Sequence, residues 1–191
     1  MKDGISYTDR IAHALLSALL ADEKEQAPSH AKGDQGVWSI RSYREGWLQY
    51  ILMKATNAEI EFSLNFEDKL ENRKKFADVT AYDVKGRPLC CIEIKGPNGT
   101  DGTTRRRILD DVKKQRSRNL ANCEMSVFAL VHGKDSEVDH FQEDVKNEIR
   151  DIKNLSTSAV SSAGDIKLNK GLNGTDYGVL RILVVRVPNN H

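Results

Sequence analysis

The sequence predicts one mixed α/β domain, residues 1–191, in which helices flank a β-sheet. Four segments carry apolar residues at helical spacing, and five others have the pattern of short strands. In chain order they alternate as α-α-β-β-β-α-β-α-β, which is typical of a mixed sheet covered by helices. With 39% hydrophobic and 30% charged residues, the 191-residue chain has a globular composition. It is long enough to bury a core without disulfides or a structural metal.

The N-terminal segment is predicted to hold two helices. Residues 7–20 form the first, with an apolar stripe of Ile11, Ala14, Leu15, Ala18 and Leu19. Residues 22–36 are polar and include a proline and two glycines, so we expect a flexible loop there. A second helix is expected to begin at Ser42, where Glu45 three residues later completes a capping box, and to end near Ala55.

Three strands are predicted next. Residues 59–64 alternate polar and apolar, as a half-buried strand does. A charged turn over residues 66–75 leads to a second strand at 76–84. A tight turn then leads to a third strand at 89–95, which ends in a Gly- and Thr-rich loop, residues 96–104.

The rest of the chain alternates between helix and strand. Helical spacing predicts helices over residues 105–120 and 138–152, and apolar runs predict strands over 126–132 and 179–187. Residues 155–174 are rich in Ser, Gly, Asn and Lys, so we expect a long flexible excursion.

Three charged residues interrupt the otherwise apolar second and third strands: Asp78, Glu93 and Lys95. Because side chains alternate along a strand, Glu93 and Lys95 share one face of the third strand. If the second and third strands pair through the tight turn, Asp78 lies close to Glu93. The alternative is a solvated face with a cross-strand salt bridge and no function.

Two neighbouring carboxylates repel each other unless a cation lies between them. Mg²⁺ takes oxygen ligands, usually one or two carboxylates completed by water and substrate phosphate. The main-chain carbonyl of Ile94 could supply a further oxygen. Lys95 lies on the same face as Glu93, where it could orient and help deprotonate a water that attacks phosphorus.

The spacing of these residues resembles a known family. Ala77-Asp78, then 14 residues, then Glu93-Ile94-Lys95 is similar to the motif of the PD-(D/E)XK nuclease superfamily, which includes many restriction endonucleases. Ala77 replaces the usual proline, a position that varies in the family. The resemblance implies a restriction endonuclease-like αβββαβ core over about residues 42–132, with an extra N-terminal helix and a C-terminal helix and strand.

The resemblance also implies an activity. We expect a Mg²⁺-dependent nuclease, with Mn²⁺ able to substitute, that hydrolyses DNA phosphodiester bonds as an endonuclease in restriction, phage defence or repair. Asp78 and Glu93 would hold the metal, Lys95 would act on the attacking water, and Glu45 would join the metal shell. Glu45 has the alternative role of a helix-capping residue. DNA is the expected substrate, with RNA as the alternative, and a homodimer or a partner subunit would supply the missing recognition surface.

A dense basic segment follows the third strand. Its members, together with a glutamine that matches one found on this helix in some family branches, are candidates to contact nucleic acid: Arg105, Arg106, Arg107, Lys113, Lys114 and Gln115. The alternative for the basic residues is a solvated helix laced with salt bridges. The alternative for the glutamine is a polar surface position.

Charge and cysteine content exclude several function classes. The net charge of +1 excludes a strongly basic tail-type binder. The three cysteines form no CxxC pair, so we expect buried free thiols rather than a zinc ribbon or a thioredoxin site. With no membrane span or signal peptide in view, we expect a cytoplasmic protein. The rival to a nuclease is a non-catalytic module that uses the same fold to bind nucleic acid or another protein.

Overall fold

The computed structural model describes residues 6–31, 45–56, 63–69, 76–118, 120, 122–152, 155–168 and 178–188. Its centre is a six-stranded mixed sheet with the strand order β1-β2-β3-β4-β6-β5. The strands are β1 (Ser63–Lys69), β2 (Phe76–Tyr82), β3 (Pro88–Asn98), β4 (Glu124–Gly133), β5 (Val160–Lys167) and β6 (Val179–Val187). The helices are α1 (Tyr7–Ala31), α2 (Glu45–Thr56), α3 (Gly102–Arg116) and α4 (Asp135–Ile149), with a short 3₁₀ helix η2 (Thr157–Ala159) before β5. The predicted mixed α/β class is therefore confirmed.

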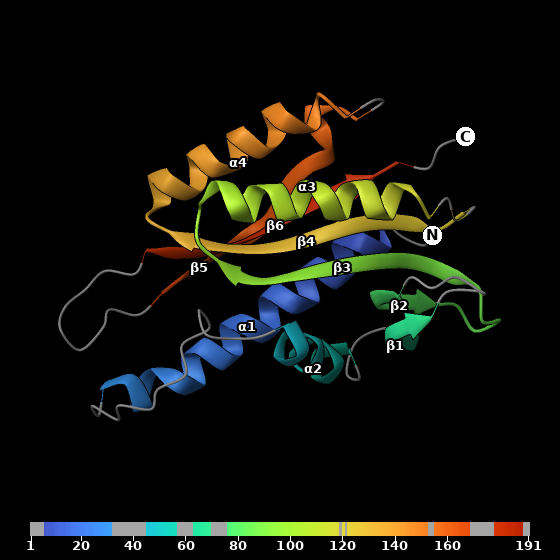
Figure 1. Cartoon of the computed structure of the whole chain (residues 1–191). Coiled ribbons are helices and arrows are strands. Elements are labelled where there is room, and N and C mark those ends of the chain that lie inside the picture. Colours follow the sequence, from blue (N-terminus) through green and yellow to red (C-terminus); the bar gives the residue numbers. More distant parts are fainter. Residues whose placement is uncertain are drawn as a thin grey trace.

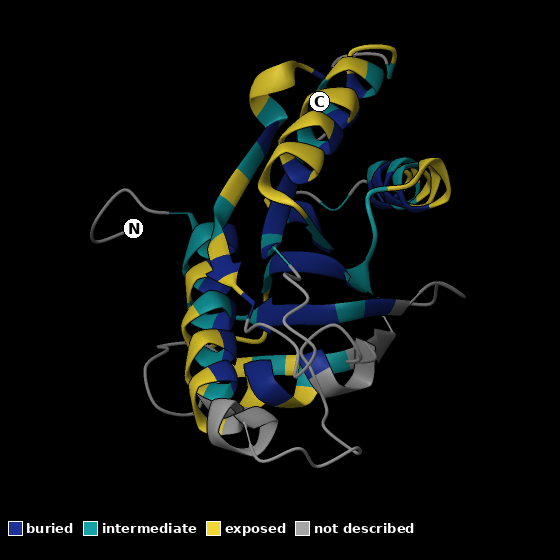
Figure 2. Ribbon diagram, turned by 90° about the vertical axis from the view of Figure 1, so that its left-hand side faces the viewer, coloured by how far each residue is buried: buried dark blue, intermediate teal, exposed yellow. Residues whose placement is uncertain are grey.

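Helices α1 and α2 cover one face of the sheet, and α3 and α4 cover the other (Figure 1). One core lies between α1, α2 and the sheet, where Ile92, Ile94 and Phe128 are fully buried. The other lies beneath α3 and α4, which contribute Ile108 and Phe141. The central strands β3, β4 and β6 are buried along most of their length, and the helices expose their outer sides (Figure 2).

The connection through α3 gives the sheet its mixed character. β3 and β4 are parallel, whereas the pairs β1–β2, β2–β3, β4–β6 and β5–β6 are antiparallel. A parallel pair needs a crossover, and α3 supplies it by packing across β3 and β4. The helix begins at Gly102, three residues earlier than predicted, because Asp101 caps it and accepts a hydrogen bond from the Thr104 N–H at 2.8 Å.

Two of the predicted loops overlap helix or strand. Residues 22–31 are helical, so the predicted loop 22–36 is wrong as far as Ala31, because good helix formers outweigh the single Pro28. The predicted charged turn over 66–75 overlaps β1, where Leu64 and Phe66 pack on the core. Residues 32–44, 57–62, 70–75 and 169–177 lie outside the described residues, and with them Ser42 and most of the first predicted strand.

The flexible excursion predicted for residues 155–174 is wrong over residues 155–168. It contains η2 and β5, and β5 forms an edge of the sheet. Its sequence, VSSAGDIK, hides the strand because only Val160 and Ile166 are buried, near its two ends. Gly164 adopts φ +149° where Leu16 of α1 lies closely over the strand, and an irregularity in the β5–β6 pairing lies beside it.

Two expectations concern the thiols and the membrane. All three cysteines, Cys90, Cys91 and Cys123, are buried free thiols, as predicted. In the described part of the chain, no helix is both long and apolar enough to cross a bilayer.

Candidate active site

The site begins where β2 and β3 part. Their pairing runs from Tyr82–Pro88 to Val79–Ile92, although both strands continue beyond that point. Beyond this last pair, the main-chain N–H of Ile94 donates a hydrogen bond to Oδ2 of Asp78 at 2.7 Å. The Asp78 carboxylate thus accepts the hydrogen bond of a main-chain N–H that would otherwise be paired with a neighbouring strand. Asp78 is consequently held against the main chain that joins Glu93 to Ile94.

Glu93 lies under α3 and is neutralised by two cations. Its Oε1 accepts a hydrogen bond from Nη2 of Arg118 at 2.5 Å, and its Oε2 accepts one from Nζ of Lys114 at 3.0 Å. The side chains of Glu93 and Arg118 are each 1% exposed, whereas Lys114 is 37% exposed. A buried charge is tolerated only when it is paired, and this carboxylate is paired at both oxygens.

Lys95, two residues along β3, pairs with the same helix. Its Nζ lies 3.2 Å from Oδ2 of Asp111, and the two side chains are 22% and 13% exposed. Burial raises the pKa of Asp111, and the nearby Lys95 opposes that rise. Glu93 and Lys95 therefore point toward α3, on the shared face that strand alternation predicts.

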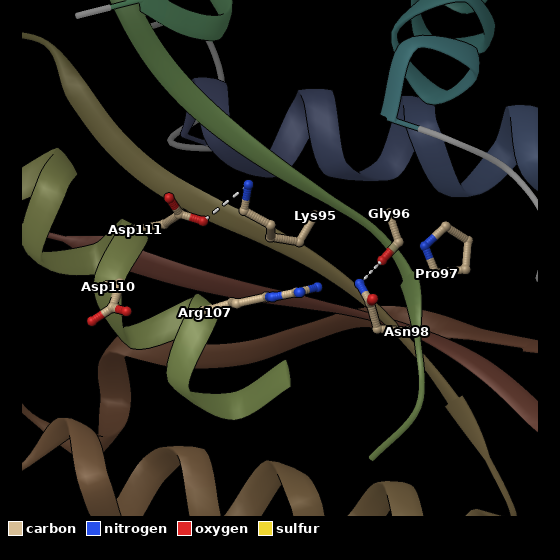
Figure 3. A pocket seen from close by; sticks show the side chains of 7 residues that line it. All are labelled: Lys95, Gly96, Pro97, Asn98, Arg107, Asp110 and Asp111. Atoms are coloured by element: carbon tan, nitrogen blue, oxygen red, sulfur yellow. Dashed lines mark hydrogen bonds and ion pairs between the residues drawn. The ribbon is translucent and has the colours of Figure 1, made fainter. Parts of the chain in front are cut away.

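An open cleft of about 510 Å³ gives solvent access to Lys95. It is lined by Lys95, Gly96, Pro97 and Asn98 from β3 and by Arg107, Asp110 and Asp111 from α3. Arg107 extends from α3 across the cleft toward Asn98, while Lys95 and Asp111 point toward each other (Figure 3). The lining thus carries two cations, Lys95 and Arg107, and two carboxylates, of which Asp111 is paired with Lys95.

The basic residues of α3 point in several directions. Arg105 pairs with Asp144 and Glu148 of α4, each at 2.5 Å, so it joins the two helices. Arg106 and Lys113 are exposed on the outer side and line a second shallow cleft between α3 and α4. Of the five basic candidates, only Arg107 lines the cleft that holds Lys95.

Gln115 has a structural position rather than a surface one. Its side chain is fully buried, and its Nε2 donates to the main-chain carbonyls of Cys91 at 3.4 Å and Ser126 at 3.1 Å. It therefore joins α3 to both parallel strands. This corrects both readings from the sequence, since a side chain without exposed surface neither contacts a nucleic acid in this conformation nor lies on the surface.

Two site residues escaped the sequence analysis. Neither Asp111 nor Arg118 was among the candidate residues named from the sequence. A signal was present, because positions 111, 115 and 118 share one face of a helix with the apolar Ile108. Glu45 is the first residue of α2, but its side chain lies outside the described residues.

The donor set is compatible with a divalent cation. Within the described ranges, no three His, Cys, Asp or Glu side chains come close enough together to form a complete metal cage. Mg²⁺ does not need one, since it is commonly held by one or two carboxylates together with water and substrate phosphate. Oε2 of Glu93 is paired with the Lys114 ammonium, the more exposed of its two cations. Asp78 and Glu93 would be the protein ligands.

Comparisons with known proteins identify no relative. No protein-family model matches the chain, and neither the curated proteins nor the solved structures contain a match.

Proposed function

We propose that the protein is a divalent-metal-dependent nuclease that hydrolyses DNA phosphodiester bonds on a restriction endonuclease-like fold. The observation that carries the proposal is the parting of β2 and β3 at Asp78, Glu93 and Lys95, next to a cleft with basic residues. The chain order α2-β1-β2-β3-α3-β4 supports it, because the PD-(D/E)XK resemblance implies an αβββαβ core.

Each residue has a role in this proposal. Asp78 and Glu93 would hold Mg²⁺ or Mn²⁺, which supplies charge stabilisation at the phosphoryl group when bound. Lys95 would orient the attacking water and take part in its deprotonation, and Asp111 holds the Lys95 ammonium in place. Arg107 would contact a neighbouring phosphate from across the cleft. A homodimer or partner subunit would supply a second site for the other DNA strand.

The test is plasmid and RNA cleavage with Mg²⁺, Mn²⁺ or EDTA, comparing the wild type with Lys95→Ala. We expect metal-dependent cleavage that Lys95→Ala slows by about 10²–10⁴-fold, the usual contribution of a group that moves a proton. Lys85→Ala is the matched control, because Lys85 is an exposed lysine in the β2–β3 turn. Absence of metal-dependent cleavage of both DNA and RNA by the wild type would refute the proposal.

A second candidate is a non-catalytic nucleic-acid-binding module. It is favoured by the double neutralisation of Glu93, which leaves this carboxylate satisfied without a metal. In that case the wild type would bind DNA with an affinity that falls as salt rises. Neither the wild type nor Lys95→Ala would cleave nucleic acid, and the substitution would change only the affinity for DNA.

A further inference from the structure

We propose that Lys114 is an exchangeable counter-ion, which occupies Glu93 in the metal-free protein and is displaced when a divalent cation binds. The proposal rests on the proposed function in one respect, namely that Glu93 is a metal ligand. Arg118 has the complementary role of a permanent positioning partner. Lys114 would thus leave Glu93 when the metal binds, whereas Arg118 would keep the carboxylate in place.

The difference between the two cations lies in their burial. Arg118 is 1% exposed and binds Glu93 Oε1 at 2.5 Å, so moving it would uncover two buried charges. Lys114 is 37% exposed and binds Oε2 at 3.0 Å, at the end of a flexible four-carbon chain. Its ammonium can leave for water by side-chain rotation alone. Lys114 is therefore the partner that can exchange.

The charges around Glu93 support the need for an exchange. The carboxylates of Asp78, Glu93 and Asp111 contribute three negative charges, and Lys95, Lys114 and Arg118 contribute three positive ones. The cluster is already neutral, so a divalent cation would leave it with a charge of +2 unless an ammonium departed. Departure of Lys114 halves this excess and frees Oε2 at the same time.

The exchange makes a prediction about affinity that does not depend on catalysis. Removing the lysine charge removes a competitor for Glu93, so Lys114→Met should bind Mn²⁺ more tightly than the wild type. We expect a gain of at least about fivefold in Kd, which corresponds to about 1 kcal/mol. If Lys114 did not compete with the metal for Glu93, its replacement would produce no such gain in Mn²⁺ affinity.

The experiment measures Mn²⁺ binding without nucleic acid, from the electron paramagnetic resonance signal of free Mn²⁺, with Mg²⁺ as competitor. Lys113→Met is the matched control. Lys113 is the preceding residue of α3, is 62% exposed and pairs only loosely with Asp110 at 3.8 Å. Both variants lose one positive charge, but only the Lys114 variant loses a contact with Glu93. Thermal denaturation of each variant checks that it is folded, and Lys114→Gln serves as a second variant.

The outcomes separate this inference from the proposed function. Tighter binding by Lys114→Met and Lys114→Gln, with Lys113→Met unchanged, supports the exchange. Binding by the lysine-114 variants alone also supports it, since the wild-type site is then blocked by its own ammonium. If the wild type binds Mn²⁺ and the lysine-114 variants bind it equally or more weakly, the exchange is wrong and the metal site stands. If no folded variant binds Mn²⁺ at millimolar concentration, both are wrong.

Discussion

Replacing Arg118 by methionine tests the most deeply buried ion pair in the described part of the candidate site. Arg118 and Glu93 are each 1% exposed, and their contact measures 2.5 Å. Removing one partner of a buried pair costs about 3–5 kcal/mol, because the other charge loses its compensation in a medium of low polarity. Lys114 still contacts Glu93 in the variant, so we expect a loss near the lower end, about 3 kcal/mol.

A double-mutant cycle tells the ion pair from simple packing. Glu93→Gln alone leaves Arg118 buried beside a neutral amide and should cost a similar amount. The combined variant removes both charges, and exchanging a buried pair for neutral groups is often close to neutral in stability. The coupling energy between the two positions should therefore exceed about 1 kcal/mol, within the range found for residues in contact.

Urea unfolding followed by circular dichroism gives the four free energies of the cycle. The slope of free energy against urea must stay the same across the variants, because a change would show that the unfolded or native state had altered. A loss under about 1 kcal/mol for Arg118→Met, or costs that simply add in the double variant, would refute the buried-pair reasoning.

Three further perturbations test other parts of the structure. Burial raises the pKa of Asp111, so the native state holds this proton more tightly than the unfolded chain does, and ionisation costs stability as pH rises above about 4. The free energy of unfolding of Asp111→Asn minus that of the wild type, measured by urea unfolding at each pH, should accordingly increase between pH 4 and 7. A difference that does not change with pH would contradict the raised pKa of Asp111. Gly178→Ala should cost at least about 2 kcal/mol in thermal unfolding, since its φ is +72° and the added Cβ would lie 2.0 Å from a main-chain carbonyl oxygen. Gly86→Ala, at the same φ with nothing within 4 Å, should cost less, and equal costs would rule out the close contact. Arg107→Ala should weaken DNA binding and lower its salt slope by about 1, whereas Arg105→Ala, whose partners lie on α4, should leave both unchanged, as fluorescence anisotropy will show.

The sequence was informative wherever periodicity was strong. The strand at 179–187 coincides with β6, because its apolar residues are buried at nearly every position. β5 could not be found in this way, since its burial depends on pairing with β6 rather than on its own pattern. The end of α1 was missed for a different reason, namely that a polar stretch with a proline matches a loop as well as an exposed helix.

For the candidate site, strand alternation predicted that Glu93 and Lys95 would point to one side, and both contact α3. What each charge pairs with could not be predicted. Arg118 is one cation in a basic run of the sequence, and only the packing of α3 on β3 shows that it is buried against a carboxylate 25 residues away. The same packing buries Gln115, whose amide joins α3 to β3 and β4.

Because of the ion pairs between β3 and α3, the candidate site should tolerate an inserted residue in the connecting loop but not one inside α3. Two of the pairs, Lys95–Asp111 and Glu93–Lys114, join β3 to α3 across a short connection, and the third joins Glu93 to Arg118, two residues past the end of α3. An extra residue in that connection can be absorbed by the loop. An extra residue inside α3 would instead turn everything beyond it by about 100°, because a helix has 3.6 residues per turn. Lys114 and Arg118 would then face away from Glu93, so homologous chains that keep this site should vary in the length of the loop and not in that of the helix.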